Sequence, residues 1–170
     1  MRRRWIAACA SAVVVAAAGA AAWELTSSGA KTLTGPGDAF TLSYPSSWRV
    51  VPQATLARLP DHPEAVLRSV GVGSVTISRG MRADLDASVL RLQVVADFSE
   101  RLEDYRLLSA GGLETRAGAI FVYSYLEPDA RDVHTVALVP AGNHTFQLDS
   151  VAAPGAGKQV ETMIRSFRPH

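Results

Sequence analysis

The sequence predicts an α+β domain: a central, mainly antiparallel β-sheet flanked by helices and preceded by one N-terminal hydrophobic export segment. Several short segments alternate apolar and polar residues, only two segments have helical spacing, and short turns join consecutive strands. Strands joined by such turns pair in antiparallel fashion. With 170 residues, of which 48% are hydrophobic, the chain is long enough for one domain with its own core.

The segment 1–23 has the pattern of a signal peptide or a signal anchor. An uncharged, alanine-rich run from Trp5 to Trp23 follows three basic residues, Arg2, Arg3 and Arg4. Ala20 and Ala22 form a small-x-small cleavage site, and cleavage there would start the mature chain near Trp23. The run is close to the roughly 20 residues that span a bilayer, so retention as an anchor stays open. Either outcome predicts an extracytoplasmic protein, secreted or anchored to the membrane.

Residues 24–37 are rich in Ser, Thr and Gly, and we expect a flexible tether there, with the folded domain spanning 38–170. The segment 40–44 alternates apolar and polar residues and predicts a half-buried strand.

Pro45 ends this strand, because proline fixes its own φ and favours extended geometry in the residue before it. After two serines, we expect Trp48 to fold back over the end of the sheet. Tyr44, Pro45 and Trp48 would then form a structural corner rather than a binding site. An exposed Trp48 that serves as a platform for a ligand remains the alternative.

The middle of the chain predicts one β region and one long helix. Three prolines exclude a long helix within 52–69, and the valines and isoleucine of 70–77 indicate a strand. Apolar residues at three- and four-residue steps predict a helix over 84–102, with Asp84 as its N-cap. Leu92 lies in the middle of this apolar stripe, so we expect it to face the sheet.

The C-terminal half of the sequence predicts a turn, three strands and a closing helix. The pair Gly111-Gly112 predicts a turn, and the β-branched and aromatic run 119–126 predicts a central strand covered on both faces. Segments 133–139 and 144–151 predict a hairpin, and 155–167 a short helix.

This order of elements resembles the PsbP-like superfamily, which includes plant photosystem proteins, a eukaryotic Ran-binding protein and exported bacterial proteins of unknown role. The first strand ends in Tyr-Pro-x-x-Trp at residues 44–48, and the last helix ends in Ser166-Phe167. The resemblance covers about residues 35–168. It implies a central antiparallel sheet with helices on both sides. It implies no shared reaction, since members are mostly accessory or binding proteins.

Composition excludes several classes of site. The single cysteine, Cys9, cannot form an internal disulfide. Acidic residues outnumber basic ones once the three N-terminal arginines are set aside, so nucleic acid is not an expected partner. A metal site could use Asp129, Asp132 and His134, or Asp61, His62 and Glu64. Residues 129–132 have the pattern of a polar hairpin loop, and we expect the loop. We therefore expect no metal and no cofactor.

The sequence predicts an exported, non-enzymatic binding or accessory module of the cell envelope, in a bacterium, whose partner is an unidentified envelope protein or small ligand. No Gly-x-Ser-x-Gly motif marks a nucleophile. The alternative is an envelope hydrolase that uses His62, His134 or His144 with a nearby acid and hydroxyl.

Export is directly testable. Residues 1–30, fused to a reporter that is active only outside the cytoplasm, should give reporter activity, because basic residues precede an uncharged run. A mature N-terminus near Trp23 would select cleavage over anchoring. A reporter that is expressed but silent would contradict export.

Overall fold

The computed structural model describes residues 29–80, 87–100, 105–115 and 118–170. The predicted export segment, with Arg2, Arg3, Arg4, Ala20 and Ala22, lies outside these residues, and so does Asp84. Within the described ranges, no helix has the length and apolar character needed to cross a membrane.

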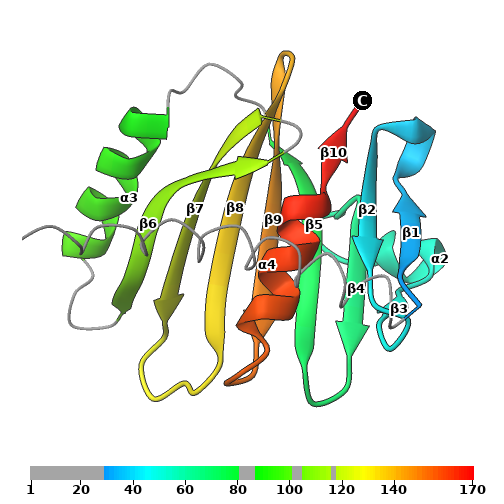
Figure 1. Ribbon diagram of the computed structural model, residues 1–170, viewed down its shortest axis with the longest axis horizontal. Coiled ribbons are helices and arrows are strands. Elements are labelled where there is room, and N and C mark those ends of the chain that lie inside the picture. Colours follow the sequence, from blue (N-terminus) through cyan, green and yellow to red (C-terminus); the bar gives the residue numbers. More distant parts are fainter. Residues whose placement is uncertain (1–28, 81–86, 101–104, 116–117) are drawn as a thin grey trace, which may run out of the picture.

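The described chain folds into two antiparallel sheets and four helical segments (Figure 1). The large sheet has the strand order β3 (Arg49–Val50), β4 (Ala65–Ser69), β5 (Gly73–Gly80), β9 (His144–Ala152), β8 (Val133–Ala141), β7 (Gly118–Leu126), β6 (Arg106–Thr115). The small sheet has the order β1 (Lys31–Thr34), β2 (Phe40–Tyr44), β10 (Arg168–Pro169). The helical segments are η1 (Pro36–Asp38), α2 (Gln53–Leu56), α3 (Ala87–Glu100) and α4 (Gly157–Ser166). The predicted α+β class with an antiparallel sheet is confirmed.

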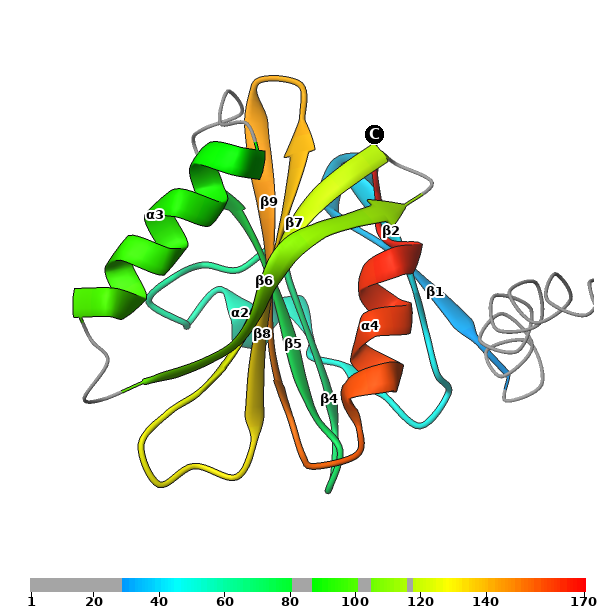
Figure 2. The ribbon, with the colours of Figure 1, turned by 60° about the vertical axis from the view of Figure 1, so that its left-hand side comes forward.

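Helices cover both faces of the large sheet. Figure 2 shows α3 and α4 on opposite sides of it. α4 packs against β9 and β2, whereas α3 packs against β6 and β7. The small sheet lies on the α4 side, so the main core is enclosed by the large sheet, α4 and β2.

Three phenylalanines form the centre of this core. Phe40 of β2 stacks on Phe167, which follows α4, with ring centroids 5.1 Å apart. Phe146 of β9 meets Phe40 at 5.4 Å and Phe167 at 5.3 Å, both edge to face. Each ring is at most 1% exposed. The cluster therefore joins the start of the domain, its central hairpin and its C-terminal end.

The segment Pro45–Trp48 forms a tight turn after β2. The Trp48 amide donates to the Pro45 carbonyl at 3.0 Å, which closes the turn. The indole is 1% exposed, and its Nε1 donates to Gln159 Oε1 of α4 at 3.2 Å. Tyr44 and Pro45 are also buried. The corner residues thus lie in the core, against the first turn of α4.

Helix α3 has the opposite rotation from the predicted one. Leu92 is 71% exposed, and Val89 and Val95 also point outward. The helix is instead oriented by Phe98, whose ring packs against three tyrosines of the sheet side, Tyr105, Tyr123 and Tyr125. The prediction for Leu92 was wrong because apolar residues occur on every side of this helix, so spacing alone could not select its buried face.

Two further sequence predictions are corrected. Lys31–Thr34, assigned to the tether, forms β1 and pairs with β2 from Lys31↔Tyr44 to Thr34↔Thr41. Its Ser/Thr/Gly-rich surroundings resemble a linker, yet backbone pairing and the half-buried Leu33 are enough for an edge strand. Gly111 and Gly112 do not form a turn; they pair with Val122 and Phe121 inside β6.

The remaining elements agree with the sequence, with shifted bounds. The strand 40–44, the covered strand near 119–126, the hairpin 133–151 and the closing helix are all present. The predicted β region 70–77 begins later, at Gly73, because the chain reverses direction between β4 and β5. Strand β4 itself was not predicted.

Replacing Trp48 with alanine should lower the free energy of unfolding by about 3–5 kcal/mol, because a buried indole and its cavity are lost. Trp48→Phe, which keeps an aromatic ring, should cost less. In a Trp5→Phe/Trp23→Phe chain, Trp48 emission should be blue-shifted and shielded from quenchers. A red-shifted, freely quenched emission would contradict its burial.

Candidate functional site

A cleft of about 440 Å³ lies between α4 and the β6–β8 part of the large sheet. α4 packs against β2 and β9 and also contacts β6, so it forms one wall of the cleft. Five consecutive residues of β6 line the cleft, together with side chains of β7, β8 and α4. The lining residues are Ser109, Ala110, Gly111, Gly112, Leu113, Val122, Ser124, Val133, Thr135, Gly157, Val160, Glu161 and Ile164.

The cleft is open because the strand beside it has little side-chain volume. Gly111 pairs with Val122, and directly paired residues share a face, so Gly111 lies on the cleft face. A Cβ atom at Gly111 would meet no heavy atom within 4 Å. A larger side chain at this position would therefore extend into the open space.

Hydroxyl groups supply most of the polarity of the sheet side. Ser124 Oγ and Thr135 Oγ1 are hydrogen bonded at 2.9 Å. Just beyond them, Ser150 Oγ donates to the Thr135 carbonyl at 3.0 Å. These hydrogen bonds link β7, β8 and β9, so the sheet side of the cleft is polar and carries no charged side chain.

The charged residue in the lining is already paired. Glu161 Oε1 accepts from Arg165 at 2.7 Å, one helical turn along α4. Arg165 also donates from Nη1 to the Glu114 carbonyl of β6 at 3.3 Å. This bridge fixes the end of α4 to the end of β6 and leaves a cleft that suits an uncharged ligand.

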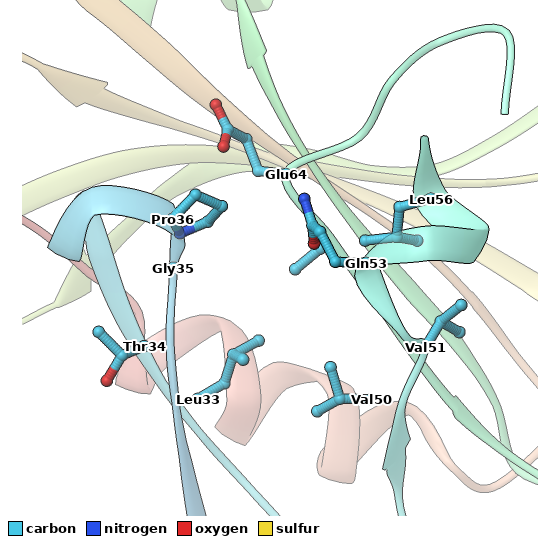
Figure 3. Close-up of a pocket in the computed structure, with 10 residues that line it drawn as sticks. Leu33, Thr34, Gly35, Pro36, Val50, Val51, Gln53, Leu56 and Glu64 are labelled. Atoms are coloured by element: carbon cyan, nitrogen blue, oxygen red, sulfur yellow. The ribbon is translucent and has the colours of Figure 1, made fainter. Parts of the chain in front are cut away.

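A second, smaller pocket of about 320 Å³ lies between β1, η1, β3 and α2 (Figure 3). Its walls are largely apolar, with Leu33, Val50 and Leu56 among them. Gln53 and Glu64 add polar groups, and Glu64 forms an ion pair with Arg79 at 3.2 Å.

A cluster of titratable groups lies on the other face of the sheet. His134 Nε2 is 3.5 Å from Glu127 Oε1, and the His134 ring stacks on Tyr125 at 5.0 Å. Burial raises the pKa of the Asp149 carboxyl; His134 opposes this rise and Glu127 adds to it. Asp149 Oδ1 is buried without a hydrogen-bond partner. Burial, followed by the charge of Asp149, raises the pKa of Tyr125 to about 12.

The three candidate histidines are far from forming one site. His62 is exposed in the loop before β4, and His144 Nδ1 lies 3.2 Å from the adjacent Asn143 Oδ1. Hydrogen bonds and ion pairs within the described ranges join His134 to a half-exposed carboxylate but join none of the three to both a carboxylate and a hydroxyl. In the same part of the chain, no three His, Cys, Asp or Glu side chains gather as metal ligands.

The cleft is not predictable from the local sequence pattern. Gly111 and Gly112 in its β6 wall indicate a turn, although the run Leu107–Leu113 lacks both proline and charge, which is compatible with a strand. The other walls come from segments up to about fifty residues away, so no local pattern joins them.

No protein-family model and no curated protein matches this chain. Among solved structures, the chain is similar to the solution structure of cyanobacterial PsbP (CyanoP) from Synechocystis, with a TM-score of 0.59 and 14% identity. The match covers 84% of this chain and 94% of that one. A crystal structure from Bacteroides thetaiotaomicron has a TM-score of 0.45 and 15% identity over 82% of this chain and 48% of that one. The chain therefore has a PsbP-like fold, as the resemblance implied.

Asp149 should make stability depend on pH. Its folded-state pKa lies above the ordinary 3.8, so the folded protein holds this proton to higher pH than the unfolded chain does. Stability from this group is therefore present below about pH 4 and is lost as pH rises through the folded-state pKa. Asp149→Asn cannot ionise and should be more stable than the wild type near neutral pH, with the difference shrinking towards pH 4.

Urea unfolding at several pH values measures this difference. Asp132→Asn, at an exposed position in the β7–β8 loop, is the control and should show no such trend. A stability difference between Asp149→Asn and wild type that stays constant with pH would contradict the expectation.

Proposed function

We propose that this protein is an exported, non-enzymatic binding or accessory module of the cell envelope that binds its partner in the cleft between α4 and β6–β8. The observation that carries the proposal is the cleft itself, an open space of about 440 Å³ with apolar and hydroxyl walls. Such a combination of apolar surface and a few polar groups is typical of binding sites.

The fold and the N-terminal sequence support the same function. The PsbP-like fold supports a binding or accessory module, since the similarity extends over 94% of the cyanobacterial PsbP chain. The basic N-terminus and the uncharged run to Trp23 support an extracytoplasmic location, secreted or anchored. The hydrolase alternative needs a histidine joined to both an acid and a hydroxyl, and the contacts of His62, His134 and His144 do not favour it.

Filling the cleft tests the proposal. Gly111→Leu places an isobutyl group in open space on the cleft face. Ala119→Leu is the control: it enlarges an exposed residue of β7 that does not line the cleft, since Ala119 pairs with Glu114 and lies on the opposite face of the sheet from Gly111. Partners cross-linked to the full chain in envelope preparations should be lost with Gly111→Leu and kept with Ala119→Leu.

Two results would contradict the proposal. One is a set of cross-linked partners that does not change with Gly111→Leu. The other is an ester or amide hydrolysis by the purified chain that disappears in His134→Ala, which would support the hydrolase instead. Melting temperatures of both variants show whether either change disturbs the fold.

A further inference from the structure

We propose that the free edge of β6 pairs with an extended, uncharged peptide segment of the partner protein, which directs alternate side chains into the cleft. The inference rests on the proposed binding function and adds the class of partner and the way it is held. Extended peptides that add a strand to a sheet edge gain affinity from backbone hydrogen bonds and specificity from pockets beside the edge.

The first observation is the position of β6. It is the last strand of the large sheet, and Figures 1 and 2 show it at the outside of the sheet. From Ser109 to Thr115 it pairs in regular register with β7, and no described strand pairs with its other side. A long edge of this kind presents a row of backbone donors and acceptors.

The second observation is that the segment Ser109–Leu113 lacks the usual protection of an edge. Natural edge strands carry charges, prolines or bulges that prevent pairing with another chain. This segment has no charge and no proline, and the register shift of β6 lies before it, between Leu107 and Ser109. Ser109 and Gly112 are exposed, so the backbone here is accessible.

The contact at Glu114 indicates which backbone groups face outward. The Glu114 carbonyl accepts from Arg165 of α4, so it points away from β7. Within a strand, the N–H and C=O of one residue point to the same side, and the side alternates with each residue. Ala110 and Gly112 therefore present their backbone groups outward, beside the cleft. Arg165 closes the far end of this edge at Glu114.

The walls of the cleft define the chemistry of the peptide. Glu161, the charged residue in the lining, is paired with Arg165, so a buried charge on the peptide would find no free partner. Val160 and Ile164 on one side and Ser124 and Thr135 on the other suit small apolar or hydroxyl side chains. A compact small ligand could fill the cleft but would leave the edge of β6 unpaired.

Selection of random peptides displayed on phage, against the full chain in detergent, tests the inference. We expect enriched peptides with an uncharged, alternating core. Gly111→Leu should weaken their binding at least about tenfold, whereas Ala119→Leu, on the opposite face of β7, should change it less than about threefold. The backbone N–H groups of a paired peptide point alternately towards β6 and away from it. An N-methyl group should therefore abolish binding at every second residue of the peptide core and be tolerated at the residues in between. The N-methyl scan uses the wild-type chain, so it remains informative if a glycine variant folds poorly.

Three results would overturn the inference. They are the absence of any enriched peptide, binding that is insensitive to the N-methyl position, and dimerisation of the wild-type chain through β6, which would make a second copy the occupant. If envelope partners still depend on Gly111 while no peptide is selected, the binding function stands and the edge pairing is wrong. If neither depends on Gly111, both proposals fail.

Discussion

The packing of Phe40, Phe146 and Phe167 is the interaction on which the rest of the structure depends. These rings join β2, the β8–β9 hairpin and the end of α4, and all are at most 1% exposed. Trp48 adds a second connection between the β2 corner and the start of α4, through Gln159. Together they hold α4 against β2 and β9. The space that remains between α4 and β6–β8 is the cleft.

The two faces of the large sheet differ in how well their buried polar groups are hydrogen bonded. The α4 face carries the main apolar core and opens at the cleft, and the buried Ser150 hydroxyl there donates to the Thr135 carbonyl. The α3 face has aromatic contacts around Phe98, but it also contains Asp149, whose Oδ1 lacks a partner. A buried carboxylate of this kind costs stability when it is ionised.

The cleft and the strand edge result from the same local sequence. Figure 2 shows β6 curving past α4. The small, uncharged residues 109–112 leave open space beside the strand, and Ser109 and Gly112 are exposed. The bridge from Arg165 to Glu114 limits this opening at one end. A strand with bulky or charged residues here would close the cleft or block the edge, so the opening depends on backbone as much as on side chains.

The sequence by itself determined the class of fold, the strand at 40–44, the β8–β9 hairpin and the closing helix, because each has a local period or turn that fixes it. Only the tertiary structure decided the rotation of α3. Apolar residues lie on all sides of this helix, so the packing of Phe98 on its tyrosine partners determines which face is buried. The tertiary structure also places Gly111 and Gly112 in a strand where the sequence predicts a turn, because pairing with β7 outweighs the local preference of glycine. The cleft was beyond local prediction for the same reason: its walls are distant in sequence and meet only when α4 packs on the sheet.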